Sequence, residues 1–290
     1  MISKLVIGTA QFSSNYGISN TSGKVKSNMA SKIIRLANKL DINFIDTAIG
    51  YKNCHQILGK IGVKNFEIIT KIPELQNKIE DISITIEKLI NKSKIDLKVN
   101  NINTVLIHNP DQLKNKIGEE IIKKLDYLKN NGIFKKIGIS IYNPKQIDTL
   151  KNIYDFEVIQ CPINVFDRRM HETGKLEELK SKGKEIHARS IFLQGLLLMK
   201  SESVPVKFNK WINLINKWNK YNDFNQSQMI KNAINHVFSQ KNIDKVIIGF
   251  QSDKELEQVL GLISKDENEV PGDLKTNDEL LLNPSKWDRL

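Results

Sequence analysis

Eight short apolar runs, separated by stretches with helical periodicity, constrain the fold of this chain more than any other feature of its sequence. The apolar runs lie at residues 5–7, 43–45, 66–69, 104–107, 136–139, 158–160, 185–188 and 245–248. The stretches between them place apolar residues on one helical face, as in Ile82, Ile86, Leu89 and Ile90. Strand and helix alternating in this way predict a closed parallel barrel ringed by helices, a (β/α)8 TIM barrel.

The chain is expected to form one domain over residues 1–290, because no linker or low-complexity segment divides it. Two stretches exceed the plain repeat: a long loop at 195–225 and a tail at 266–290. Loops on the C-terminal face of such barrels carry function, so both are expected near a substrate mouth. Trp211 and Trp218 either contribute to that mouth or pack one face of a helix, since a spacing of seven residues is helical.

The formal net charge of +11 raises the possibility of a nucleic-acid or membrane partner. The lysines that supply it are scattered, however, and the arginines form no stripe, so we expect solvated helix faces and no nucleic-acid partner. No apolar run is long enough to cross a membrane, and no membrane partner is expected. Two cysteines favour a reducing compartment and a cytoplasmic location. The histidines show no metal-ligand spacing, and the composition leaves monomer and dimer both open.

Four polar residues lie at or after the ends of three successive predicted strands. Asp46 comes directly after a buried run, and Tyr51 follows five residues later, beyond the flexible Gly50. Lys71 ends the next predicted strand, Glu67-Ile68-Ile69-Thr70-Lys71, and His108 directly follows the run after it. A tyrosine can be a general acid if its pKa, about 10 when unperturbed, is drawn towards the working pH. A nearby ammonium group lowers such a pKa, so we expect Lys71 to act on Tyr51 in this way.

The order Asp46, Tyr51, Lys71, His108 resembles the catalytic tetrad of the aldo-keto reductases. The resemblance covers nearly the whole chain, because further matching segments occur in the right order. These are Gly8-Thr9-Ala10-Gln11, His108-Asn109-Pro110, Gly138-Ile139-Ser140, Gln160 with Asn164, and Val246-Ile247-Ile248-Gly249.

The resemblance implies an NAD(P)-dependent oxidoreductase that reduces a small aldehyde or ketone, or runs the reverse oxidation. Tyr51 would donate the proton, Lys71 would stabilise the phenolate, Asp46 would hold Lys71, and His108 would orient the carbonyl oxygen. Two alternatives remain open at this stage. Lys71 could form a Schiff base, as in an aldolase, or the chain could be a nicotinamide-binding redox sensor or regulatory subunit with little turnover.

The resemblance also implies where the cofactor binds. Ser140 and Gln160 would hold the nicotinamide carboxamide, with Asn164 nearby, and Gly8, Thr9 and Ser190 would also contact the cofactor. The family usually has Asn directly after that serine, whereas this chain has Ile141, whose side chain has no hydrogen-bond donor.

Arg189 is a second departure from the family, because many relatives have an aromatic residue there that stacks on the nicotinamide. A planar guanidinium can also stack, or it can bind an acidic group of the substrate. The second use would suit a sugar derivative with an anionic group.

The adenosine and pyrophosphate end is expected after the last predicted strand, at Gly249, Gln251 and Ser252, where a helix begins. Glu255 occupies the apparent position of an arginine that binds the 2′-phosphate in many relatives. A carboxylate there would repel the phosphate and accept from a ribose hydroxyl, which favours NAD. Lys254 beside it keeps NADP open, so the choice between NADP and NAD is undecided from the sequence.

Overall fold

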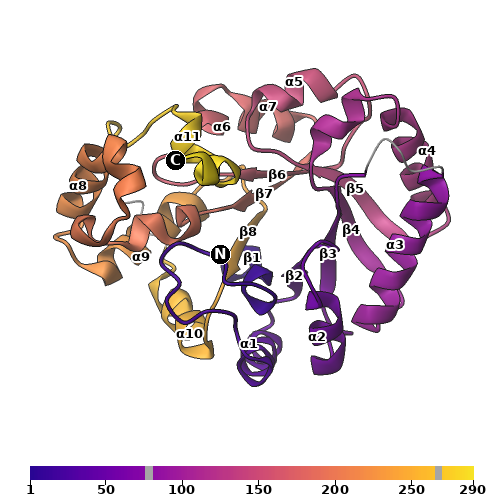
Figure 1. The fold of residues 1–290 in the computed structure, drawn as a ribbon, viewed down its shortest axis with the longest axis horizontal. Helices are drawn as coiled ribbons and strands as arrows, with labels where there is room; N and C mark the ends of the chain where they lie inside the picture. The colour runs from indigo at the N-terminus through magenta and orange to yellow at the C-terminus, as the bar shows by residue number, and fades with distance from the viewer. Residues whose placement is uncertain (76–80, 265–269) are drawn as a thin grey trace.

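The computed structural model describes residues 1–75, 81–264 and 270–290. Its eight strands form a closed barrel in chain order, in which each strand is parallel to the next and β8 pairs with β1 (Figure 1). The strands are β1 Leu5–Gly8, β2 Phe44–Asp46, β3 Glu67–Ile72, β4 Ile102–Ile107, β5 Phe134–Ser140, β6 Val158–Pro162, β7 Glu185–Arg189 and β8 Lys245–Gly249. Each contains most or all of one predicted apolar run, so the predicted TIM barrel is confirmed.

Helices surround the strands in Figure 1. The α-helices are α1 Ser27–Lys39, α2 Cys54–Ile61, α3 Ile82–Leu97, α4 Gly118–Asn130, α5 Lys145–Leu150, α6 Arg169–Glu172, α7 Lys175–Ser181, α8 Ile212–Tyr221, α9 Gln226–Phe238, α10 Asp253–Leu262 and α11 Glu279–Leu282. Short 3-10 turns lie at η1 Ile2–Lys4, η2 Ala10–Phe12, η3 Pro110–Lys114, η4 Leu193–Leu198, η5 Ser201–Ser203, η6 Val206–Trp211 and η7 Pro284–Arg289. Within the described part of the chain, none of the helices combines the length and apolar character that a membrane span requires.

Local sequence signals set several of these boundaries. Helix α4 ends before Gly132, which has a φ of 72° that suits glycine, and Ile133 N donates to Leu128 O at 3.1 Å. Helix α5 follows Pro144, and the side chain of Asn143 accepts from Lys145 N at 2.9 Å. The end of α4 lies just before β5, and the start of α5 lies just after it.

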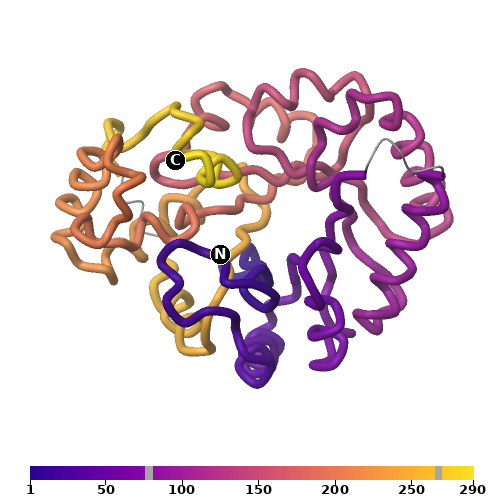
Figure 2. Tube along the Cα trace, viewed as in Figure 1, coloured from indigo at the N-terminus to yellow at the C-terminus, as the bar shows by residue number. Residues whose placement is uncertain are grey.

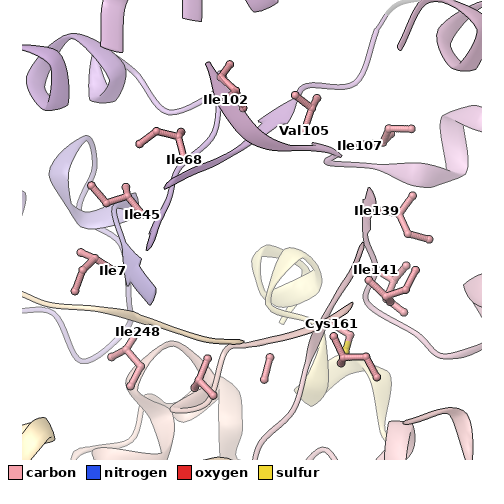
Figure 3. Close-up of a cluster of buried hydrophobic side chains, with 14 of the residues drawn as sticks. Ile7, Ile45, Ile68, Ile102, Val105, Ile107, Ile139, Ile141, Cys161 and Ile248 are labelled. Carbon is pink, nitrogen blue, oxygen red and sulfur yellow. The ribbon is translucent and has the colours of Figure 1, made fainter. Parts of the chain in front are cut away.

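The core has two layers around the barrel wall. Figure 3 shows Ile7, Ile45, Ile139 and Ile248 on the outer side of the ring of strands, where they pack against the helices. A smaller inner cluster contains Val6, Ile69, Leu106 and Val158, all fully buried. The strands are therefore apolar on both faces, as expected for a parallel sheet covered on both sides.

A second apolar cluster joins the long loop to the tail, outside the repeating barrel. It contains Trp218 of α8 and Trp287 of the tail, both buried. In Figure 2 the tail (yellow) runs beside the segment that follows β7 (orange). Trp218 Nε1 donates to Leu197 O at 2.7 Å and Trp211 Nε1 donates to Asp278 Oδ2 at 3.1 Å, so both tryptophans are packing residues. The first residues of the predicted tail, 266–269, lie outside the described residues.

Candidate active site

A cavity of about 640 Å³ opens at the C-terminal ends of the strands. Asp46, Tyr51, Lys71 and His108 all line it. Because every strand of a parallel barrel ends on the same face, residues far apart in sequence meet there. The structure therefore brings the four residues of the expected tetrad into one cavity.

Asp46 and Lys71 form a buried ion pair. Asp46 ends β2, and it lies opposite Ile69 of β3, so Lys71 is placed two residues further along the neighbouring strand. Lys71 Nζ donates to Asp46 Oδ1 at 2.6 Å and to Thr47 O at 2.9 Å. Burial lowers the pKa of Lys71, and the Asp46 carboxylate opposes that change. The pair holds the ammonium group in one position at the floor of the cavity.

Tyr51 is positioned by the turn before α2. Its backbone N donates to Ala48 O at 3.0 Å, and Cys54 N donates to Tyr51 O at 3.1 Å. Lys71 Nζ lies 5.8 Å from the centroid of the tyrosine ring. The ammonium group is therefore close to the ring while its hydrogen bonds are directed at Asp46 and Thr47.

The pKa of Tyr51 is raised well above its ordinary value of 10.0, chiefly by burial and next by the charge of Asp46. Arg189 opposes this change. This direction is opposite to the one expected from the sequence, where Lys71 was to lower the pKa. The physical reason is that the cost of burying a phenolate beside a carboxylate outweighs the attraction of nearby cations.

His108 faces Tyr51 across the cavity. It follows β4, and its backbone N donates to Ile72 O at 3.1 Å. The His108 and Tyr51 ring centroids are 6.3 Å apart with the rings nearly perpendicular, at 79°. Burial, together with the charges of Lys71 and Arg189, lowers the pKa of His108 to about 4. The imidazole is therefore neutral at pH 7 and has one N–H to donate.

Gln160 connects the ion pair to the next part of the cavity. Its Nε2 donates to Asp46 Oδ2 at 2.8 Å, while its Oε1 is buried without a hydrogen-bond partner. Only the NH2 group can donate to a carboxylate, so the unpaired atom must be the acceptor. Ser140 lies opposite Gln160 in the register and also lines the cavity. An unpaired acceptor beside a hydroxyl suits a ligand amide, such as the carboxamide of a nicotinamide.

Ile141 and Asn164, the residues near Ser140 and Gln160 in the sequence, do not contribute side chains to the cavity. Ile141 N donates to Gln160 O at 2.9 Å, and its side chain is buried in the outer apolar cluster, away from the cavity (Figure 3). Asn164 is fully buried and does not line the cavity; its Oδ1 accepts from Phe166 N and Asp167 N, both at 3.0 Å. Asn164 therefore shapes the loop after β6.

Arg189 ends β7 and reaches across the end of β6. Its Nη2 donates to Ile141 O at 2.9 Å and its Nη1 to Ser190 Oγ at 3.2 Å. The guanidinium carbon lies 4.2 Å from the centroid of the Tyr142 ring, and Nε is buried without a partner. Arg189 and Ser190 both line the cavity.

The segment after Arg189 has a strained backbone. Ser190, Leu193 and Gln194 have φ values of 57°, 47° and 53°, in the left-handed region that non-glycine residues rarely adopt. Ile18 N donates to Gln194 O at 2.9 Å, which connects this segment to the loop after β1. Strain held by surrounding contacts is typical of ligand-binding segments.

The end of β8 also contributes to the cavity wall, through Ile247, Ile248 and Gly249. Gly249 lies opposite Gly8, and a Cβ on Gly249 would stand 2.2 Å from the side chain of Gln11. Glycine at this position therefore leaves room for a polar side chain on the cavity wall. Thr9 also lines the cavity, and its Oγ1 donates to Asp46 O at 2.9 Å.

Helix α10 begins beside these glycines. Ser252 Oγ accepts from Glu255 N at 3.2 Å, and Glu255 Oε2 accepts from Gln251 N at 2.7 Å, an arrangement similar to a capping box. Gln251 and Glu255 are among the residues that line the cavity, whereas Ser252 and Lys254 are not. The carboxylate, and not the neighbouring ammonium group, is therefore on the cavity wall.

Several cavity residues were not expected from the sequence, among them Gln11, Tyr16, Tyr142 and Gln194. Gln11 and Tyr142 lie within three residues of a strand end, and this position in the sequence could have indicated that they line the cavity. Tyr16 and Gln194 lie in irregular segments whose path no periodicity predicts. Among the described residues, no group of three or more His, Cys, Asp or Glu side chains could hold a metal ion.

Solved structures with similar folds were found among bacterial proteins. The Pseudomonas aeruginosa protein PA4992, assigned by its description to the aldo-keto reductases, is 19% identical with a TM-score of 0.65, over 89% of this chain and 88% of that one. The glycerol dehydrogenase AKR11B4 of Gluconobacter oxydans is 21% identical with a TM-score of 0.70, over 90% and 86%. At these identities the likeness concerns the fold. A comparison with curated proteins finds no match.

The family model described as the aldo/keto reductase family matches residues 4–271, most of the chain. This match agrees with the closed barrel and with the cavity at the ends of its strands. The chain therefore belongs to the aldo/keto reductase family, whose members are oxidoreductases acting on small carbonyl compounds.

Proposed function

We propose that this protein reduces an aldehyde or ketone with a nicotinamide cofactor, and that Tyr51 is the general acid. The observation that carries the proposal is the cavity in which Asp46, Lys71, Tyr51 and His108 meet beside the unpaired acceptor of Gln160. The bound cofactor, in its reduced form, would supply hydride to the carbonyl carbon. The protein's own residues would hold the carbonyl group and provide the proton.

Tyr51 would donate its hydroxyl proton to the carbonyl oxygen as that oxygen gains negative charge. Its raised pKa keeps the phenol protonated at neutral pH, the form that a general acid requires. His108, neutral at pH 7, would donate an N–H to the same oxygen and orient it. The Lys71 ammonium group, held by Asp46, would stabilise the phenolate that remains.

Ser140 and Gln160 are proposed to hold the carboxamide of the nicotinamide. Gln160 offers its Oε1 to the amide NH2 while its own NH2 remains on Asp46. The bound carboxamide would then lie next to Asp46, the residue that holds Lys71 in place. Gly8, Thr9 and Ser190 would complete this side of the site, because all three line the cavity.

The cofactor is proposed to be NADH, although NADPH was left open by the sequence. Gln251 and Glu255 line the cavity at the start of α10, where the adenosine end is expected. A carboxylate there repels a 2′-phosphate and can accept from a ribose hydroxyl. Ser252 would not touch the cofactor but would cap α10 and so help to position Glu255. Lys254 would not contact the cofactor.

The Tyr51→Phe variant tests the general acid, because it removes the transferable proton and keeps the ring. Turnover of a generic aldehyde such as 4-nitrobenzaldehyde should fall by about 10²–10⁴-fold, the usual contribution of general acid catalysis. Cofactor affinity, measured by fluorescence titration, should barely change. Reduction by Tyr51→Phe at nearly the wild-type rate would exclude this role.

The same assay separates the two alternative functions. A redox sensor or regulatory subunit would bind cofactor without appreciable turnover of any aldehyde. A Schiff-base aldolase would be trapped covalently at Lys71 by borohydride in the presence of its carbonyl substrate. We expect no such trapping, because Lys71 Nζ is bonded to Asp46 and Thr47.

A further inference from the structure

Arg189 introduces a positive charge into the cavity that no carboxylate balances. Among the salt bridges of residues 1–75, 81–264 and 270–290, none involves Arg189. Its hydrogen-bond partners are neutral, a carbonyl oxygen and a hydroxyl, and its Nε has no partner.

Arg169, which contacts the same loop, differs from Arg189 because its charge is paired with a carboxylate. Arg169 donates from Nε and Nη2 to both oxygens of the buried Asp167 carboxylate, at 2.8 and 2.7 Å. Arg169 Nη2 also donates to Tyr142 O at 2.9 Å. The paired Arg169 guanidinium therefore fixes the backbone at Tyr142, the residue on whose ring Arg189 stacks. Arg189 is therefore a half-buried guanidinium on the cavity wall without a carboxylate partner.

Of the described residues near the tetrad, Arg189 is the one cavity residue whose charge is not neutralised by a neighbouring side chain. Lys71 and Asp46 neutralise one another at 2.6 Å, and His108 is neutral at pH 7. Glu255 is the one further charged residue among the described residues that line the cavity, and it lies in the first turn of α10.

The position of Arg189 adjoins the proposed carboxamide site. The guanidinium donates to the carbonyl of Ile141, the residue directly after Ser140. Ile141 N in turn donates to the carbonyl of Gln160. A nicotinamide held by Ser140 and Gln160 would therefore have its ring close to a cation.

We propose that Arg189 makes the cavity selective for the redox state of the cofactor, favouring the reduced nicotinamide over the oxidised one. The inference rests on the proposed nicotinamide site. The oxidised ring carries one positive charge and the reduced ring is neutral, while the rest of the molecule is the same. Like charges close together repel each other, and a half-buried guanidinium is only partly screened by solvent, so Arg189 destabilises only the oxidised complex. The protein then binds the reactant of carbonyl reduction tightly and releases the oxidised product.

The test compares the affinities of NADH and NAD⁺ by calorimetry, with NADPH and NADP⁺ as a second pair. We use the ratio within a pair because changes in affinity common to both redox forms cancel. The wild-type protein should bind the reduced form more tightly. Arg189→Gln should reduce that preference by about ten- to a hundredfold, the scale of one nearby charge in a partly screened site.

Two further variants separate charge from shape. Arg189→Lys keeps the charge without the planar fork, so its ratio should stay near the wild-type value. Arg35→Gln removes one charge from an exposed position on α1 and should leave the ratio unchanged. Thermal unfolding of each variant checks that the fold is retained.

Each remaining outcome counts against the inference. An equal loss of affinity for both forms in Arg189→Gln would mean that Arg189 binds a part common to both. An unchanged ratio together with a raised KM only for acidic carbonyl substrates would assign Arg189 to a substrate anion. If the wild-type protein binds neither form, the proposed function fails and this inference fails with it.

Discussion

Tyr51 shows how a single residue depends on its surroundings for its protonation state. Burial and the Asp46 charge raise its pKa, and Arg189 is the cation that opposes them. A phenol that keeps its proton is available as an acid over a wide pH range. The same shift makes the phenolate harder to form, so the reverse oxidation would be favoured by alkaline conditions.

The pH dependence of the reaction follows from this direction. Reduction needs the protonated phenol, so turnover is lost only as the pH rises through the pKa of Tyr51 in the folded protein. Because that pKa lies above 10.0, reductive kcat should show no loss from Tyr51 between neutral pH and about pH 10. Stopped-flow rates with deuterated cofactor, which identify the chemical step, provide the measurement. A decline of the isotope-sensitive rate within that range would contradict the assignment.

Single residues also mark the limit of prediction from sequence. Asp46 and Lys71 were predictable because each lies just after an apolar run, and parallel strands bring such residues together. The pKa direction of Tyr51 was not predictable, because it depends on how completely the folded chain excludes water from the ring. The contact between Gln160 and Asp46 joins residues 114 positions apart, and no local pattern reveals it.

Among the elements, the turn from β8 into α10 determines the choice of cofactor in the proposed function. Glu255 accepts from Gln251 N, and this bond holds its carboxylate at the cavity wall. Adjacent helix residues point about 100° apart, so Lys254 cannot face the same phosphate. The carboxylate therefore sets the local charge at this end of the cavity.

Glu255→Arg should convert this turn into a site for the 2′-phosphate. Removing the repulsion and adding a bidentate donor should strengthen NADPH binding by about 1–3 kcal/mol, the scale of hydrogen bonds to a charged group. Fluorescence titration with NADH and NADPH measures the change. Lys254→Gln is the matched control and should alter neither affinity much. Clearly tighter binding of NADPH by the wild-type protein would overturn the proposed preference.

The segment after β7 shows why some elements escape sequence reasoning. Residues 185–188 were predicted as a strand from their apolar run, and β7 covers them. The next residues turn sharply through left-handed positions such as Gln194, for which the sequence has no glycine signal except Gly195. Their path is set by long-range contacts, including the bond from Ile18 N to Gln194 O.

At the scale of the whole molecule, the barrel carries a second apolar cluster on the side where the long loop and the tail meet. Thr276 N donates to Phe166 O at 3.0 Å, which fixes the tail to the segment after β6. Pro284 and Ser285 of the tail line the cavity, as does Leu198 of the long loop. The tryptophans of the long loop do not line it. The tail thus contributes to the cavity through small residues, while its aromatic residue stabilises the packing.

Three histidines in separate parts of the fold, His55 buried and His108 and His236 partly buried, make the whole molecule sensitive to acid. Burial is the main cause that lowers the pKa of His55, His108 and His236 from 6.5 to about 4. His55 shows the structural basis, because its ring nitrogens lie 3.2 Å from Thr70 Oγ1 and 3.0 Å from Ser93 Oγ. These contacts connect α2, β3 and α3 around a neutral imidazole.

The free energy of unfolding should therefore fall as the pH is lowered from 6.5 to 4. Each histidine binds a proton in the unfolded chain before it does so in the folded one, so its contribution is complete above pH 6.5 and is lost towards pH 4. The slope is about 1.4 kcal/mol per pH unit for each proton involved. Urea unfolding at a series of pH values measures it. His55→Gln should lower the slope by the contribution of about one proton. His171→Gln, at an exposed position, is the matched control and should leave the slope unchanged. An identical slope in wild type and His55→Gln would show that burial of this imidazole does not govern the acid sensitivity.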